Sequence, residues 1–313
     1  MESVEPIETK HNQAVWGLAS SSRNQLISGS LDGSVKIWAF KDEKLSQEAD
    51  FPNSHSLGVT CTDISSSGEV ALSTALDNKI VIYDMNTLRV ARQIQVNAGA
   101  AFKACFSPDG TRIAACGRLG KVVLYSTETG ELQDTIDTLS GQFLMSIKFA
   151  PCGGYFACGT NQGVIYTFDV VNLSVYRKFT VHHLPIRALA YSPDGYKLAA
   201  GCDDGRITIY DPTYQSVLGS LIGHSSWITS MQIVREDIGD VLLSGSCDTS
   251  LRFWDLTNMS SIANLKVGGE VSNLPYQVWC AAQLKLPGRL SKVVAGLESG
   301  FLSLYDQPFF KSK

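Results

Sequence analysis

Residues 185–222 read PIRALAYSPDGYKLAAGCDDGRITIYDPTYQSVLGSLI, and this stretch decides the fold. It holds four short runs in which apolar residues alternate with polar or small ones, a pattern typical of β-strands. The reversals SPDG and DDG between these runs carry the proline, aspartate and glycine that tight turns require. The stretch therefore predicts a unit of four short strands joined as hairpins, without a helix of useful length.

The third run of this unit, which ends in an aromatic residue, recurs seven times along the 313 residues. The seven aromatic residues are Trp38, Tyr83, Tyr125, Phe168, Tyr210, Trp254 and Tyr305. They lie 42 to 51 residues apart, close to the roughly 40–45 residues of one four-stranded propeller blade. We therefore predict an all-β fold, a single seven-bladed β-propeller.

The repeat sets the expected blade boundaries within one domain covering residues 1–313. The units are residues 11–50, 51–95, 96–138, 139–179, 180–221, 222–265 and 266–310. The last unit is too short for a fourth strand, whereas residues 3–10 have no unit of their own. We predict that residues 3–10 form the outer strand of the last blade and close the ring, which leaves no long sheet edge exposed.

The composition excludes several classes of protein. With 26 basic and 30 acidic residues, the chain has no surplus of positive charge for direct binding to nucleic acid. No apolar run is long enough for a membrane helix, and the acidic N-terminal residues do not resemble a signal peptide. The eight cysteines form no C-x-x-C pair. We expect a soluble intracellular protein, monomeric on its own, with reduced thiols and no metal ion.

Four of the five histidines share one phase of the repeat, and an aspartate accompanies each of them in the turn before the third strand. The histidines are His11, His55, His182 and His224, and the aspartates are Asp32, Asp77, Asp204 and Asp248. The other three units lack both residues. Because a buried imidazole and a buried carboxylate each need a hydrogen-bond partner, we predict four structural His–Asp pairs.

These histidines also argue against catalysis. Ser244, His224 and Asp248 could form a catalytic triad on paper, but the first unit repeats the same set of residues, and a single active site would not require that. No phosphate-binding loop, nucleophile elbow or metal-ligand spacing is present. We expect no catalytic residues and no cofactor.

A partner surface is expected at the rim of the channel, where loops lead into the innermost strands. Alignment of the units places Trp16, Thr60, Phe102, Met145, Arg187, Thr229 and Trp279 in one ring, and Ala14, Pro185, Trp227 and Gln277 two residues earlier. Tryptophan and arginine are frequent interface hot spots. The predicted partner-binding residues are Trp16, Trp227, Trp279, Arg187, Phe102, Met145, Pro185, Asp203 and Glu298.

The alternative for two of these residues is the hydrophobic core. Trp16 and Trp279 lie in strand positions that can point either way, whereas Trp227 follows Ser225 and Ser226 in a loop, where we expect exposure. Asp203 and Glu298 could offer a charge match to a basic motif of the partner.

The segments GSLDGSVKIW, GHSSWI with SGSCDTSLRFWD, and the repeated SPDG resemble the WD-repeat (WD40) family over essentially the whole chain. In that family the histidine, a serine or threonine of the second strand, the turn aspartate and a tryptophan of the third strand form a hydrogen-bonded tetrad. Only the first and sixth units match it fully, with Trp38 and Trp254. The resemblance implies the fold and is nearly silent on function.

The segments HHLPIRALAYSPDG, DDGRITIYDPTYQSVLGSLIGHSSWI, NSHSLGV and KIWAFKDEKL resemble the small WD-repeat subunits of the Superkiller complex, which in animals are also assigned to the RNA polymerase II-associated factor (Paf) complex. This resemblance implies a non-catalytic scaffold in 3′-to-5′ mRNA decay in the cytoplasm, docked on a helical-repeat protein beside a helicase, with a further nuclear role in transcription elongation. KVGGEVSNLPYQVW and LKLPGRLS in the seventh unit depart from the pattern.

Two alternative functions remain open at this stage. The first is an adaptor of another assembly, such as a ubiquitin-ligase receptor or a histone-tail reader. The second is a propeller enzyme, which would need ionisable residues clustered in the channel, whereas the predicted ring is mostly apolar or neutral.

Overall fold

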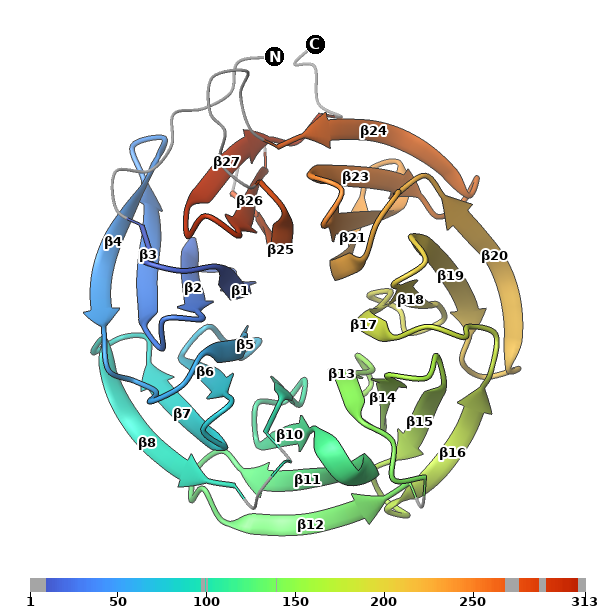
Figure 1. The fold of residues 1–313 in the computed structure, drawn as a ribbon, viewed down its shortest axis with the longest axis horizontal. Helices are drawn as coiled ribbons and strands as arrows, with labels where there is room; N and C mark the ends of the chain where they lie inside the picture. Colours follow the sequence, from blue (N-terminus) through green and yellow to red (C-terminus); the bar gives the residue numbers. More distant parts are fainter. Residues whose placement is uncertain are drawn as a thin grey trace.

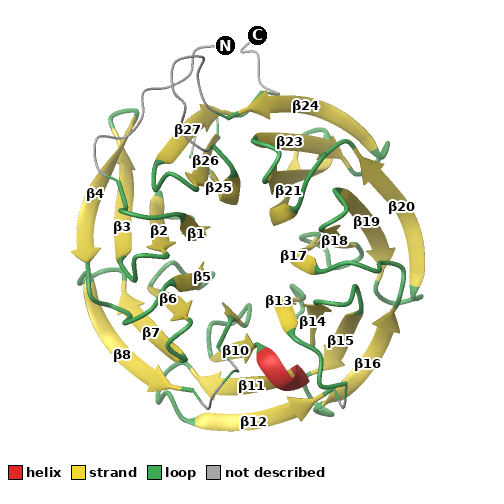
Figure 2. Cartoon of the chain, in the orientation of Figure 1, coloured by secondary structure: helices red, strands yellow, loops and turns green. Residues whose placement is uncertain are grey.

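Seven β-sheets stand side by side around a central channel, as the computed structural model shows (Figure 1). It describes residues 10–96, 99, 101–138, 140–267, 276–286 and 291–308. Within these ranges the only helical element is a three-residue 3-10 turn, Arg118–Gly120 (Figure 2). The prediction of an all-β, seven-bladed propeller is confirmed.

Each blade is an antiparallel meander whose first strand lines the channel and whose last strand faces outward (Figure 1). Blades one and two contain β1 (Val15–Ser20), β2 (Gln25–Ser30), β3 (Val35–Lys41), β4 (Lys44–Phe51), β5 (Val59–Ile64), β6 (Val70–Ala75), β7 (Lys79–Asp84) and β8 (Arg89–Gln95). Blades three and four contain β9 (Lys103–Phe106), β10 (Arg112–Cys116), β11 (Lys121–Ser126), β12 (Leu132–Asp137), β13 (Leu144–Phe149), β14 (Tyr155–Thr160), β15 (Ile165–Asp169) and β16 (Ser174–Phe179). Blades five to seven contain β17 (Ile186–Tyr191), β18 (Leu198–Cys202), β19 (Arg206–Asp211), β20 (Ser216–Ile222), β21 (Ile228–Glu236), β22 (Gly239–Ser246), β23 (Ser250–Asp255), β24 (Ser260–Lys266), β25 (Val278–Leu284), β26 (Lys292–Leu297) and β27 (Leu302–Asp306).

Blade seven has three described strands, and the predicted closing strand at residues 3–10 lies outside the described residues except for Lys10. Lys10 Nζ lies 4.8 Å from the centre of the Phe301 ring, and the His11 N–H donates to the Gly300 carbonyl at 3.0 Å. The described chain therefore begins against blade seven. The two segments of this blade that depart from the repeat pattern are also mostly outside the described part, which leaves out residues 268–275 and 287–290.

Alternate residues of one strand supply two different interblade cores. In β2, Leu26 packs in a cluster with residues of blade seven, whereas the adjacent Ile27 packs in a cluster with residues of blade two. Both side chains are fully buried. Because successive strand residues point to opposite faces, the second and third strands must be apolar on both faces. This explains the continuous apolar runs in the middle of each repeat.

A glycine in the turn between the second and third strands lies against the next blade. At Gly33, Gly163, Gly205 and Gly300, φ is between 79° and 85°. A Cβ atom at these positions would press on the backbone carbonyl of the histidine that begins the next unit, or of His11 in the case of Gly300. The contact that joins blades one and two thus also joins blades seven and one.

We expect Gly205→Ala to lower the free energy of unfolding by roughly 3 kcal/mol, because the new methyl group combines an unfavourable φ with a steric clash. Its Cβ would lie 2.5 Å from the His224 carbonyl oxygen. The matched control is Gly141→Ala, where φ is 62° and no atom lies within 4 Å of the added Cβ. It should cost only about 1 kcal/mol. Equal losses in urea unfolding would show that the interblade contact has no separate effect.

Candidate functional site

A chain of four side chains fixes the loop that begins blade six. The Trp254 indole N–H donates to Ser244 Oγ at 2.9 Å, and Ser244 Oγ lies 2.7 Å from His224 Nε2. His224 Nδ1 lies 2.8 Å from an Asp248 carboxylate oxygen. Because Nδ1–H donates to the carboxylate, Nε2 accepts the serine proton. The loop, the second strand and the following turn are therefore held by one buried network.

Blade one builds the same network, but the serine two residues after its turn aspartate, equivalent to Ser250 of blade six, here lies between the histidine and the aspartate. Trp38 donates to Ser28 at 2.8 Å, and Ser28 lies 2.7 Å from His11 Nε2. His11 Nδ1 bonds to Ser34 Oγ at 2.7 Å, and Ser34 donates to Asp32 at 2.6 Å. The nearest approach of His11 to Asp32 is 4.0 Å. The predicted direct His–Asp bond is replaced here by a bond through Ser34, whose hydroxyl both accepts and donates.

Blade two keeps the direct bond without a tryptophan. His55 Nδ1 lies 3.1 Å from Asp77, and His55 Nε2 lies 2.7 Å from Ser73. The Tyr83 hydroxyl lies 3.0 Å from Ser73 and donates to Ser54 at 2.9 Å. The Tyr83 hydroxyl therefore lies where the indole N–H lies in blades one and six, but it donates its one proton to Ser54 instead of to the network serine.

Blade five departs from the predicted pairing. His182 Nδ1 is 4.0 Å from Asp204, beyond hydrogen-bond distance. Ala200 stands in β18 where the other three units have serine. Within the described residues, His182 Nε2 and the Tyr210 hydroxyl consequently have no hydrogen-bond partner. The predicted direct His–Asp bond is therefore absent from blade five, and its imidazole also lacks the serine partner that the other three units provide.

Burial keeps His11, His55 and His182 neutral. It lowers the pKa of His11 to about 4, and it also lowers the pKa values of His55 and His182. Burial opposes the charge on Asp248, but hydrogen bonds from His224 and Ser250 bring the pKa of this carboxyl well below its ordinary value. In blade two, the network is thus a neutral imidazole donating to a carboxylate.

The buried serine of the network is not placed for nucleophilic attack. Ser244 has no exposed surface, and its oxygen already contacts both Trp254 and His224. A substrate carbonyl could not reach it without breaking the network. The geometry therefore assigns Ser244, His224 and Asp248 to structure.

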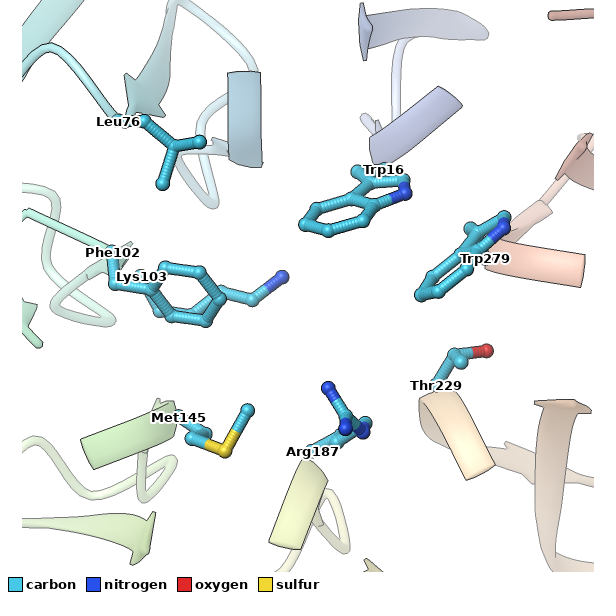
Figure 3. Close-up of a pocket in the computed structure, with 8 residues that line it drawn as sticks. All are labelled: Trp16, Leu76, Phe102, Lys103, Met145, Arg187, Thr229 and Trp279. Atoms are coloured by element: carbon cyan, nitrogen blue, oxygen red, sulfur yellow. The ribbon is translucent and has the colours of Figure 1, made fainter. Parts of the chain in front are cut away.

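The predicted ring of rim residues meets at one end of the channel, in a cavity of about 200 Å³ that we call the channel mouth (Figure 3). Its lining residues come from all seven blades, two of them from blade three, and point toward the central space (Figure 3). They are Trp16, Leu76, Phe102, Lys103, Met145, Arg187, Thr229 and Trp279. Thr60, also predicted for this ring, is fully buried and donates to the Phe102 carbonyl at 2.6 Å.

Two tryptophans form one wall of the channel mouth. The rings of Trp16 and Trp279 are stacked, with centroids 4.8 Å apart and an angle of 26° between planes. Both side chains are half-buried, and neither indole N–H has a hydrogen-bond partner among the described residues. Of the two alternatives considered for them, core and rim, the structure supports the rim. The Phe102 ring lies opposite (Figure 3) and packs edge-on against Phe143, with centroids 4.8 Å apart.

Trp227 is the exposed tryptophan of this face, with 42% of its surface accessible. The Arg187 guanidinium carbon lies 4.3 Å from the centre of its ring, which is cation–π geometry. Arg187 also donates two hydrogen bonds to Asp203, at 2.6 and 2.9 Å. The Asp203 side chain is only 7% exposed. Its charge is therefore compensated within the chain, contrary to the expectation that it faces a basic partner motif.

The remaining predicted residues have mixed positions. Met145 lines the mouth but is only 8% exposed, so it offers a small contact area. The Pro185 carbonyl accepts a hydrogen bond from the Asp203 N–H, and the Glu298 N–H makes the equivalent bond to Gln277. Leu76 makes this same backbone bond, to Gly58, and an alignment of the turns could have identified it. Sequence reasoning also missed Lys103, which follows a predicted ring residue and donates to the Thr60 carbonyl at 2.6 Å.

Comparison with known proteins identifies matches over much of the chain. The WD domain, G-beta repeat family model matches residues 4–39, 47–84, 173–211 and 215–255. The WD repeat-containing protein SL1-17 of Schistosoma mansoni is 30% identical over 206 residues, 64% of this chain and 67% of the relative. The described part contains no helix long and apolar enough to cross a membrane.

Two further relatives carry functional names. The meiotic recombination protein rec14 of Schizosaccharomyces pombe is 27% identical over 65% of this chain and 68% of its own length. The antiviral protein SKI8 of Saccharomyces cerevisiae is 29% identical over 44% of this chain and 40% of its own length. Similar identities thus accompany different functional names.

A pair of substitutions tests the serine of the network. Ser244→Ala should lower the free energy of unfolding by roughly 3 kcal/mol, because two buried polar atoms lose their partner. Ala200→Ser should raise it by about 1 kcal/mol, since it supplies the missing hydroxyl group in blade five. Urea unfolding measures both changes. A loss of stability in Ala200→Ser would contradict this account of blade five.

The lowered pKa of His11 predicts acid sensitivity. An unfolded histidine titrates near 6.5 and folded His11 near 4, so between these values the unfolded chain binds more protons. Stability is complete above this window and falls as pH drops through it, by roughly 3 kcal/mol for His11 alone. Denaturant unfolding between about pH 7 and about pH 5 measures the slope. His11→Gln should reduce this slope, and the part due to His55 and His182 should remain.

Proposed function

The chain belongs to the WD-repeat family of protein-interaction scaffolds, and we propose that it binds a short segment of a larger partner protein at the channel mouth and the adjoining Trp227. On this proposal the chain performs no catalysis. Its function is to hold one protein beside another in a multi-subunit assembly.

The observation that carries the proposed site is the arrangement of Trp227 on Arg187. The Arg187 guanidinium packs against the exposed Trp227 indole and is itself held by Asp203. This arrangement gives a rigid, apolar contact surface. Rigid tryptophan and arginine side chains lose little conformational entropy on binding, which is why they recur as hot spots. The stacked Trp16 and Trp279 continue this surface into the channel.

We further propose that the assembly is of the Superkiller type, with a helical-repeat protein and a helicase as partners in cytoplasmic 3′-to-5′ mRNA decay. The resemblance of residues 182–195 and 203–228 to those WD-repeat subunits and the similarity to SKI8 support this assignment. By the same resemblance, a nuclear role in transcription elongation with the Paf complex belongs to the proposal.

A second candidate is a WD-repeat adaptor of another assembly. The observation that favours it is the similarity to rec14, which covers more of the chain than the similarity to SKI8 and whose name refers to meiotic recombination. Because one propeller can present the same surface to different proteins, the two candidates differ only in the proteins that bind.

Trp227→Ala should abolish partner capture while leaving stability nearly unchanged, because this side chain is 42% exposed. Affinity purification from native lysate with mass spectrometry measures capture, and thermal unfolding checks the fold. The matched control is Tyr214→Ala, which removes an aromatic residue that is 82% exposed and outside the channel mouth. It should retain all partners.

The outcomes separate the parts of the proposal. A helicase and a helical-repeat protein captured by the wild type and lost from a folded Trp227→Ala variant would support both site and assembly. Different partners lost in the same way would support the site and refute the Superkiller assignment. Unchanged capture by Trp227→Ala would refute the site.

A further inference from the structure

Three potential metal ligands meet in blade five at the position where other blades form the hydrogen-bonded network. One ligand atom each from His182, Cys202 and Asp204 lies within 4.8 Å of the other two. The sequence spacing conceals this group, because 19 residues separate the histidine from the cysteine. Folding of β18 and its turn against the loop before β17 brings them together.

Among the residues that the structure describes, this group occurs in blade five alone. Blades one and six have Ser30 and Ser246 where blade five has Cys202. In blade six the imidazole and the carboxylate are joined at 2.8 Å, whereas in blade five they stand 4.0 Å apart. Blade five thus combines a thiol with an imidazole and a carboxylate that are not hydrogen-bonded to each other.

We propose that blade five binds one zinc ion through the imidazole of His182, the thiolate of Cys202 and the carboxylate of Asp204. Sulfur, nitrogen and oxygen from these residue types are the ligands that zinc takes in proteins. A soft thiolate beside an imidazole disfavours magnesium and calcium, which require oxygen ligands.

The geometry requires only a small closure. Zinc bonds of about 2.0 to 2.3 Å in a tetrahedron place ligand atoms roughly 3.3 to 3.8 Å apart. The three atoms must therefore approach by about 1 Å from their present separation of up to 4.8 Å. Asp204 is free to make this movement, because its side chain is 38% exposed. Its carboxylate accepts a hydrogen bond from the N–H of Arg206, two residues later, at 2.9 Å.

Two of the three ligands are buried and the third is exposed, as a zinc site open to water on one side requires. Cys202 is fully buried and His182 is 4% exposed, so the inner side excludes water. The exposed Asp204 leaves an outer side on which water can complete a tetrahedron. Burial lowers the pKa of His182, so its ring is neutral and able to bind a metal near neutral pH.

Zinc binding must release one proton from the cysteine. Burial raises the pKa of the Cys202 thiol to about 12 in the metal-free chain. The Zn–S bond forms as the S–H bond breaks and the proton passes to solvent, so affinity should fall as the pH is lowered. The ion would fix the loop that ends at Pro185 to the turn of Asp203, and Asp203 in turn binds Arg187 at the channel mouth.

Titration of the reduced, metal-free full chain with Co²⁺ tests the site, because cobalt takes the place of zinc and its bond to thiolate produces a charge-transfer absorption. The wild type should saturate at one Co²⁺ per chain, and Zn²⁺ should remove the absorption. Cys202→Ser should abolish it while preserving the fold, since serine occupies the equivalent position in blades one and six. Cys152→Ser, which changes an exposed thiol elsewhere, is the control and should retain it.

A second variant distinguishes loss of the metal site from misfolding of the chain. Asp204→Asn changes an exposed side chain and should weaken cobalt binding at least roughly tenfold, while thermal unfolding without metal stays at the wild-type value. No saturable absorption in the wild type, or undiminished absorption in Cys202→Ser, would overturn the zinc site. Neither result depends on the partner-binding proposal.

Discussion

The burial of both faces of every blade is the constraint on which the structure depends. Leu26 and Ile27, adjacent in one strand, pack in the cores on opposite sides of blade one, so a blade without neighbours would expose apolar surface on both faces. Ring closure removes that surface. The glycine contacts at the turns, including Gly300 against His11, set the distance at which successive blades meet.

The histidine network follows from the same constraint. A loop that crosses the end of a buried blade brings polar groups out of water, and each must find a partner. Blades one, two and six satisfy this requirement with a serine, a histidine and an aspartate in three variants of one chain of bonds. Residue types that suggest catalysis therefore have a structural role here, and burial keeps the imidazoles of His11 and His55 neutral.

The two functional sites proposed for this chain lie where the repeats differ from one another. The fold requires apolar residues at the interblade positions and leaves the rim of the channel variable. Blade five is one such repeat, because Arg187 and Asp203 lie against Trp227 at the mouth and the group around His182 lies in the same blade. Both proposals, the partner surface and the zinc site, thus rest on positions where one repeat departs from the others.

The sequence by itself determined the fold, because a strand pattern repeated at near-constant spacing has few ways to bury its apolar residues. It also determined the ring that converges on the channel mouth, since equivalent positions in each blade face the same axis. Only the tertiary structure decided how each side chain is used. It paired Asp203 with Arg187, inserted Ser34 between His11 and Asp32, and brought Cys202 to His182. These outcomes depend on ångström distances between residues far apart in the chain, and hydrogen bonds and metal sites form only within such distances.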